Sequence, residues 1–198
     1  EIIYPLIADA LVSQSYGNTT YIVNGSMNSA TMNTIPFGNP GGNDAWGGHR
    51  ATKAWYGLFG DLNTSTDDRA ELFWTSGHQY EMVDYKEWTH GYPSVKFRNS
   101  NYFSASTPTV FSGTDFPLFR LADAYLMFAE CVVRGASGGT INQATDYVNA
   151  VRTRANASTI TPGQLTLDFL IDERARELNL EGHRRSDLIR FGKFTGGS

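Results

Sequence analysis

Acidic and basic side chains are dense near the carboxyl end of the sequence, where they follow one another at helical spacing. Two carboxylates a few ångströms apart could act as the acid and base of a glycoside hydrolase. Each acid, however, has an arginine three or four positions away, which is typical of ion pairs within one helix. The expected pairs are Asp172 with Arg176, either Glu173 with Arg176 or Arg174 with Glu177, and Glu181 with Arg184 or Arg185.

We therefore interpret this segment as a structural charge network that fixes its helix against the rest of the fold. Arg174, Arg176 and Arg185 are expected to be partly buried and paired with carboxylates. The predicted members of the network are Glu173, Arg174, Arg176, Glu177, Glu181, Arg185 and Asp187.

Other residues that could do chemistry form no recognised pattern. The histidines His49, His78, His90 and His183 have no spacing that would place two of them on one face of an element, so no metal site is expected. The glycine-rich stretches lack the spacing of a phosphate-binding loop. The single Cys131 lacks the polar neighbours of a nucleophile and is expected in the core. We predict no catalytic residue and no cofactor.

Trp46 lies in a segment with the composition of a sugar-binding surface. The apolar face of a sugar ring packs on an indole, and its hydroxyls need polar side chains at the edge. Asn43 and Asp44 precede Trp46, two glycines leave its face uncrowded, and Arg50 follows. Turn-forming residues place this segment at the surface. Trp46 could equally be a buried residue that packs this loop onto the helices, and the two alternatives remain open.

Other aromatic residues are further candidates for ligand contact. Trp74, Trp88 and Tyr92 are predicted to contribute, the last two because they flank a turn with Gly and Pro. Trp55 lies on the apolar face of a short predicted helix and is expected in the core.

The elements that must position these residues differ between two parts of the sequence. Residues 1–117 contain all four tryptophans and are rich in Gly, Asn, Ser and Thr, which predicts a loop-rich, ligand-binding region. Within it we expect strands at 20–23 and 94–97 and a short helix at 52–59. Residues 118–198 are predicted to be helical, and the two parts are expected to form one compact unit.

The helical part shows an apolar repeat of 3.6 residues. The first stripe runs from Leu118 to Val133 and stops at Gly135. A second helix begins after Thr140, whose side chain is expected to cap it, and a third covers 167–180, with Thr166 as its cap. A shorter helix is expected at 186–191. Helix pairs of this size predict a mainly α fold, a stack of helical hairpins with the loop-rich region beside it.

Composition excludes several classes of protein. The 16 basic and 20 acidic residues give a net charge of -4, which offers no basic surface for a nucleic acid. No apolar run is long enough to span a bilayer, and a single cysteine cannot form an internal disulfide. The sequence begins without Met and ends directly behind an apolar helical pattern, so we expect it to be a piece of a longer protein.

Three motifs in order resemble the SusD/RagB family of Bacteroidetes nutrient-binding outer-membrane lipoproteins. They are FRLADAYLMFAE at 119–130, VNAVRTRA at 148–155, and DERAREL at 172–178 followed by EGHRRSDLIRFGK at 181–193. The resemblance is strong over residues 116–195. It is looser over residues 43–69, where WGG at 46–48 and DDR at 67–69 are similar to family landmarks.

This resemblance implies a tetratricopeptide-like helical stack, part of a larger fold, that binds glycans on an exposed aromatic surface and has no enzymatic activity. It also implies a partner, a SusC-like TonB-dependent transporter, and a place on the extracellular face of the outer membrane. The N-terminal lipidated cysteine that anchors such proteins is absent from this sequence. The alternatives are a glycoside hydrolase with carboxylates such as Asp67 and Asp84, and a helical scaffold that binds proteins.

Overall fold

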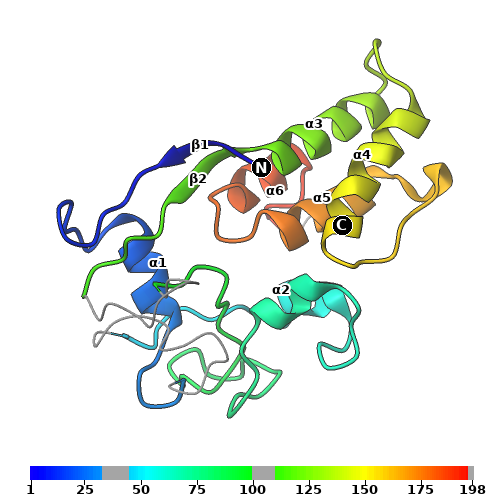
Figure 1. Ribbon diagram of the computed structural model, residues 1–198. Helices are drawn as coiled ribbons and strands as arrows, with labels where there is room; N and C mark the ends of the chain where they lie inside the picture. The colour runs from blue at the N-terminus through cyan, green and yellow to red at the C-terminus, as the bar shows by residue number, and fades with distance from the viewer. Residues whose placement is uncertain (33–44, 100–109, 196–198) are drawn as a thin grey trace. The chain divides into compact units, whose positions relative to one another are not determined.

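The computed structural model describes residues 1–32, 45–99 and 110–195 of the chain (Figure 1). The chain divides into two compact units. The helical unit comprises Glu1–Tyr4, Leu58–Glu71 and Pro117–Ser198, and the loop unit comprises Pro5–Gly57 and Leu72–Phe116. Residues 58–71, which we expected with the loop-rich part, group with the helices because Arg69 is buried among helical carboxylates.

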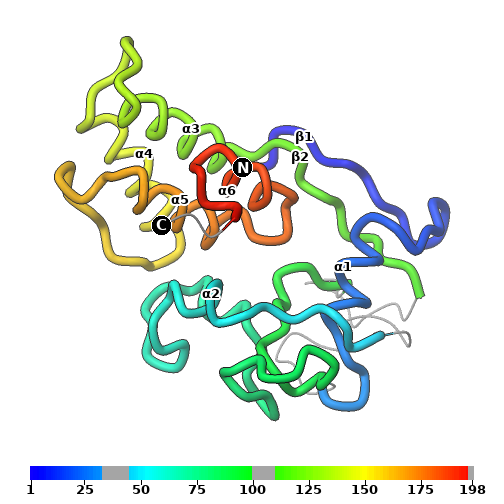
Figure 2. The backbone as a smooth tube through the Cα atoms, turned by 180° about the vertical axis from the view of Figure 1, so that it is seen from behind, coloured from blue at the N-terminus to red at the C-terminus, as the bar shows by residue number. Residues whose placement is uncertain are grey.

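Four α-helices form the body of the helical unit, as the apolar periodicity predicts. They are α3 (Leu121–Val133), α4 (Ile141–Arg154), α5 (Leu167–Glu177) and α6 (Arg184–Arg190). Short 3₁₀ turns occur at Asp68–Leu72 and Pro162–Gln164. Two opposite views show α3 and α4 as a hairpin joined at one end by a loop (Figures 1 and 2). The mainly α fold is therefore confirmed.

The predicted helix caps are also confirmed. The Thr140 hydroxyl accepts from the backbone N–H of Gln143 at 3.2 Å, and that of Thr166 accepts from Phe169 at 3.1 Å. Several boundaries differ from the prediction, among them those of the last helix, which is Arg184–Arg190 and not 186–191. Leu118 belongs to a strand rather than to α3, and α5 ends at Glu177 because the chain turns at Leu180, whose φ of 57° is left-handed.

The core of the helical unit is apolar, and where α3 and α4 meet it includes the small side chains of Ala129 and Ala144. Its fully buried members are Leu126, Ala129, Ala144, Val148, Leu165, Leu170 and Leu178. The prediction that Cys131 lies in the core is wrong, since its side chain is exposed. Cys131 follows Ala129 by two positions, which turns it about 200° around the helix, away from the buried face.

The loop unit contains little regular structure. Its helices are α1 (Asn18–Ser26) and α2 (Lys53–Tyr56), with a 3₁₀ turn at Gly57–Phe59 after the latter. The short helix predicted at 52–59 is confirmed, but the side chain it buries is Tyr56, while Trp55 is only half-buried. Burial raises the pKa of Tyr56 to about 12, so its hydroxyl remains a donor to the Tyr80 carbonyl.

Both strands predicted in the loop-rich part are wrong. Residues 20–23 lie in α1, and 94–97 contain only a single bridge, between Ser94 and Phe73. The helix at 20–23 escaped prediction because its buried face carries Thr19, Thr20 and Asn24, whose polarity hides the apolar period.

A strand at the start of the chain, β1 (Ile2–Leu6), pairs with β2 (Phe116–Arg120). They run in opposite directions, since Leu121 donates to the carbonyl of Glu1 and Ala8 donates to the carboxylate of Asp115. None of the helices in the described ranges combines the length and the apolar composition needed to cross a bilayer.

Candidate functional site

The backbone around Trp46 closes the carboxyl end of α1. Four successive backbone N–H groups, from Trp46 to His49, donate to carbonyls at the end of that helix. Trp46 donates to Asn24 at 2.7 Å, and Gly48 and His49 donate to Gly25 at 2.8 and 2.6 Å. The last carbonyls of a helix have no partner within it, so this segment supplies the missing donors. These bonds fix the backbone of Trp46 at the end of α1.

The helix that receives these bonds is itself held by polar side chains. Thr19 donates to the carbonyl of Thr114 at 2.6 Å, and the Asn24 amide donates to that of Val110 at 3.0 Å. The Thr20 hydroxyl accepts from the Ser112 N–H at 2.9 Å. With this face of α1 bound to the backbone of residues 110–114, Tyr21 is left on the exposed side.

Three exposed rings gather at this place and form what we call the aromatic cluster, defined as Tyr16, Tyr21 and Trp46. Their exposed fractions are 57%, 54% and 43%. The centroid of Trp46 lies 6.3 Å from that of Tyr16, with planes inclined by 37°, and 6.0 Å from that of Tyr21, inclined by 60°. The half-buried Phe111 supports Tyr16 from 5.0 Å.

The polar edges of the aromatic cluster are uncommitted. Among the residues that the structure describes, neither the hydroxyls of Tyr16 and Tyr21 nor the indole N–H of Trp46 makes a hydrogen bond. By contrast, the indole of Trp74 donates to the Ser76 carbonyl at 3.0 Å, and that of Trp88 donates to the Thr31 hydroxyl at 3.3 Å. Exposed rings with open polar edges can bind a ligand that has both apolar faces and hydroxyls.

Two glycines make the approach of these segments possible. A Cβ on Gly25 would lie 2.2 Å from the ring of His49. Gly47 has a left-handed φ of 62°, and a Cβ there would lie 2.7 Å from the Asn28 amide. A larger residue at position 25 would displace the His49 ring, and one at position 47 would strain the left-handed backbone.

Arg50 ties the neighbouring loop together. Its guanidinium donates to the carbonyls of Gly48, Tyr85, Glu87 and His90 at 2.5 to 3.1 Å. It also lies over the ring of Trp88, 5.6 Å from the centroid. The role that the structure shows for Arg50 is therefore to hold the loop of residues 85–90 beside the segment that carries Trp46.

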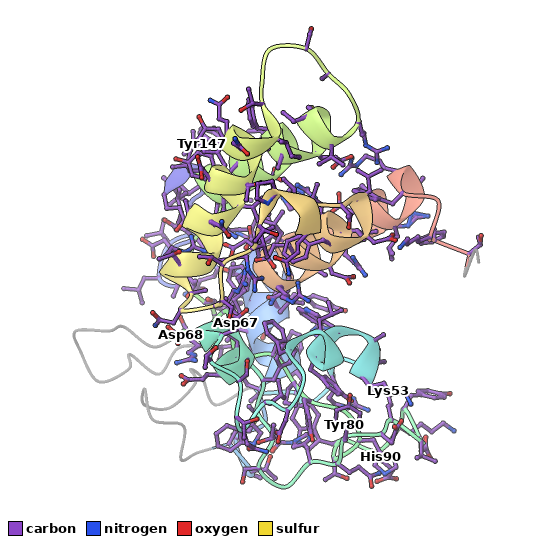
Figure 3. All side chains as sticks on the ribbon, turned by 90° about the vertical axis from the view of Figure 1, so that its right-hand side faces the viewer. Lys53, Asp67, Asp68, Tyr80, His90 and Tyr147 are labelled. Atoms are coloured by element: carbon purple, nitrogen blue, oxygen red, sulfur yellow. The ribbon has the colours of Figure 1, made fainter. Side chains whose placement is uncertain are left out.

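The remaining predicted ligand-binding residues are distributed over the loop unit. Trp74, Trp88 and Tyr92 are all half-buried. Tyr92 packs on Tyr56 at a centroid distance of 4.5 Å, close to the Tyr80 that Figure 3 labels. Asn43 and Asp44 lie outside the described residues.

The predicted charge network lies in the helical unit and links more segments than expected. Its first cluster centres on Arg69, which donates to Glu173 at 2.9 Å and to Glu177 at 3.0 Å across more than 100 residues of sequence. The basic members are Arg69, Arg120, Arg152, Arg154 and Arg176, and the acidic members are Glu1, Asp67, Glu173, Glu177 and Glu181. Five guanidinium groups thus balance five carboxylates.

A second cluster joins α3, α5 and α6. Arg174 is buried and donates to Asp123 at 2.7 Å and to Asp187 at 2.8 Å. Arg190 bridges Asp187 and Glu130. The cluster consists of Arg134, Arg174, Arg190, Asp123, Glu130 and Asp187.

Several of the expected pairs within α5 are wrong. Only Glu173 with Arg176, at 3.0 Å, forms as predicted. Arg174 turns to the second cluster, and Glu181 pairs with Arg120 at 2.7 Å. Their partners come from other elements because a buried charge needs the nearest counter-charge in space, which sequence spacing does not reveal.

The expectation for Arg185 is also wrong. Its side chain is exposed and lies over the ring of Phe194, at 4.9 Å from the centroid, and no carboxylate of the described residues lies within ion-pair distance. Arg185 precedes the buried Asp187 by two positions, so the turn of α6 directs it to solvent.

Two carboxylates of the first cluster, those of Glu177 and Asp67, are held in the ionised form by arginines. Burial raises the pKa of Glu177. A larger effect in the opposite direction comes from the hydrogen bond and charge of Arg154 and from the charges of Arg120 and Arg69. The pKa of Glu177 is therefore below its ordinary value. The pKa of Asp67 is lowered in the same way, mainly by Arg69. Asp67, which Figure 3 labels, is bound through both of its oxygens to Arg69. A carboxylate held this way is a poor general acid.

In the described part of the chain, no group of three or more His, Cys, Asp or Glu side chains has an arrangement that could hold a metal ion. Two histidines have structural bonds: the His78 Nδ1 bonds the carbonyl of Gly91 at 2.8 Å, and the His90 Nδ1 accepts from the N–H of Asp84 at 2.8 Å.

Comparison with known proteins assigns the chain to a family. The model of the SusD family matches residues 63–197. The chain belongs to the SusD family. The starch-binding protein SusD of Bacteroides thetaiotaomicron is 42% identical over 140 residues, which are 68% of this chain and 24% of that protein. This chain therefore spans about a quarter of the length of that curated relative.

Solved structures of the SusD superfamily resemble both units. Surface glycan-binding protein A from Bacteroides uniformis is 27% identical, with a TM-score of 0.56, and the match covers 79% of this chain and 32% of that one. Surface glycan-binding protein A from Bacteroides thetaiotaomicron, at 22% identity, covers 98% of this chain and 43% of its own length with a TM-score of 0.61. The second match shows the fold alone.

In this SusD-family chain, the motifs that resemble the family supply the buried charges. DERAREL contributes Glu173, Arg174, Arg176 and Glu177, and DDR contributes Asp67 and Arg69. Sequence reasoning missed Tyr16 and Tyr21, the two rings that flank Trp46. A helical assignment of residues 18–26 would have placed Tyr21 opposite the buried Val23, but the polar face of α1 concealed that signal.

Proposed function

We propose that this chain is the glycan-binding part of a SusD-type protein that holds oligosaccharides or polysaccharides without converting them. The observation that carries this proposal is the aromatic cluster, three exposed rings whose polar edges make no hydrogen bond to the described residues. Sugar rings would stack on these faces, and their hydroxyls would bond to the open edges. Trp46 is the central contact, and Asn43 and Asp44 remain candidates for bonds at its edge.

The names of the relatives support a glycan as the ligand. One relative is a starch-binding protein, and a structural neighbour at 27% identity is a surface glycan-binding protein. We infer that the whole protein works at the extracellular face of the outer membrane and delivers glycans to a SusC-like TonB-dependent transporter. A lipid anchor attached to another part of the protein would hold it there.

Each sugar contact is expected to be weak. A stacked ring contributes about 1 kcal/mol beyond the area it buries. Affinity for a polymer would rise through several contacts along one chain, because the second contact forms at a high effective concentration. The half-buried Trp74, Trp88 and Tyr92 are the candidates for such further contacts.

The hydrolase alternative finds less support. Asp67, one of its two proposed carboxylates, is bound by Arg69 and has a lowered pKa. The other, Asp84, accepts the backbone N–H of Lys86 at 2.9 Å and so shapes its own turn. An assay for reducing ends released from bound polysaccharide distinguishes the two functions, and a rate that depends on Asp84 would favour the enzyme.

The decisive experiment replaces Trp46 with Ala and measures affinity for maltohexaose, laminarihexaose and cellohexaose by calorimetric titration. We expect affinity for the bound sugar to fall roughly tenfold, the equivalent of about 1.4 kcal/mol. Thermal stability should change little, because a ring that is 43% exposed buries far less than one whose removal costs about 3–5 kcal/mol.

Tyr85→Ala is the matched control, since Tyr85 is 73% exposed and lies outside the aromatic cluster. It should leave both affinity and melting temperature unchanged. A Trp46→Ala variant that melts much earlier, or that binds its sugar as the parent does, would show that Trp46 only packs the loop. The platform would then have to be sought at Trp74, Trp88 or Tyr92.

A further inference from the structure

His49 extends the aromatic cluster by one polar ring. Its imidazole lies 4.7 Å from the ring of Tyr21, with planes inclined by 60°. The Nδ1 and Cε1 atoms face Gly25, where a Cβ would lie only 2.2 Å from either. Its backbone N–H donates to the same residue at 2.6 Å. The imidazole is therefore fixed between the end of α1 and Tyr21.

The nitrogens of this ring have no task in the fold. Neither forms a hydrogen bond with any residue that the structure describes, and His49 is only half-buried. Nor is either nitrogen among the buried polar atoms that lack a partner. His78 and His90 differ, because each binds the backbone of its own loop.

We propose that His49 is a specificity-determining residue of the sugar site, and that its imidazole forms a hydrogen bond with a hydroxyl of the sugar unit stacked on Tyr21. This inference deepens the proposed function and rests on it. The ring is already held in place, so binding immobilises no further side chain. A site that bonds a particular hydroxyl discriminates against sugars that lack it, because its own polar group is then left unpaired.

The protonation state of His49 suits this role. Burial lowers the pKa of His49 from its ordinary value of 6.5, so the imidazole is neutral at neutral pH. Neutral imidazole has one donor and one acceptor nitrogen, which matches a hydroxyl that can also do either. Tyr21 is the titratable neighbour that faces it, from α1, and the segments at Gly25 and Gly48 present only backbone.

The test compares two substitutions of His49 by calorimetric titration with maltohexaose, laminarihexaose and cellohexaose. His49→Phe keeps a ring against Gly25 and Tyr21 but removes both nitrogens, and we expect roughly a fivefold loss of affinity, the effect of one hydrogen bond. His49→Gln places an amide where Nε2 lies and should restore most of that loss. His183→Phe is the control: His183 is a half-buried histidine of the helical unit, and this variant should bind as the parent does.

A second measurement follows the imidazole directly. In protein with nitrogen-15-labelled histidine, the ring signals of His49 should shift on addition of the bound hexasaccharide, while those of His183 should not. If Trp46→Ala weakens binding but His49→Phe does not and the His49 signals stay in place, the inference fails and the proposed function stands. If the unsubstituted protein binds none of the three hexasaccharides, and the corresponding polysaccharides do not retard it in affinity gels, the inference about His49 and the proposed function are both refuted.

Discussion

Replacing Arg69 with Met should destabilise the helical unit more than any exposed substitution in this chain. The Arg69 side chain is 8% exposed and bonds Asp67, Glu173 and Glu177 at 2.8, 2.9 and 3.0 Å. Without it, Glu173 retains two arginines and Glu177 retains two others. Asp67 has no second cation within ion-pair distance among the described residues, so its buried charge would keep only the more distant charge of Arg152 and the backbone N–H of residue 69.

The expected loss of stability follows from the Asp67 carboxylate that is left without its ion-pair partner. Removing one partner of a buried ion pair costs about 3–5 kcal/mol. For a protein of this size each kcal/mol lowers the melting temperature by about 2–4 °C, so the variant should melt about 6–20 °C earlier. Lys53→Met is the matched control. Its ion pair with Glu81 is 2.9 Å long, but the two side chains are 59% and 55% exposed, and such pairs contribute about 0–1 kcal/mol.

Urea unfolding followed by circular dichroism of the helices measures both variants. Adding Asp67→Asn to Arg69→Met should recover about 1–3 kcal/mol, because it removes the stranded charge. An Arg69→Met variant that loses less than about 1 kcal/mol would refute the reasoning. So would a double variant that is less stable than Arg69→Met alone, since Asp67 could not then be the source of the cost.

Three further substitutions or conditions test other contacts of the two units. Glu177→Gln should lower the melting temperature and leave glycan affinity unchanged, because the Glu177 carboxylate pairs with three arginines of the helical unit. A variant that loses binding but keeps its stability would contradict this. Gly25→Ala should destabilise the loop unit by about 1–3 kcal/mol and weaken glycan binding together, because its Cβ would overlap His49. Burial raises the pKa of Asp67, Glu130 and Glu177, but their arginines lower it more, so folding favours the ionised forms. Their stabilisation is complete above the ordinary pKa values of 3.8 and 4.5 and is lost as pH falls below them, which urea midpoints measured across that range should show.

The sequence by itself determined the helices of the helical unit. Local signals sufficed there: the apolar period gave α3, α4 and α5, and the hydroxyls of Thr140 and Thr166 marked two starts that the structure confirms. Each of these signals acts within about one helical turn, so neighbours along the chain contain all the information. The motifs of the family were readable for the same reason, because they are contiguous.

Only the tertiary structure decided which charges meet and which rings are exposed. Arg69 and Glu173 are 104 positions apart, and no spacing rule connects them. The charged residues were recognised as a network, yet most of their partners were assigned wrongly, because burial selects the nearest opposite charge in space. The same holds for the aromatic cluster. Trp46 could be proposed from its neighbours in sequence, but Tyr16, Tyr21 and His49 join it only because backbone bonds to the end of α1 bring residues 46–49 back to that helix.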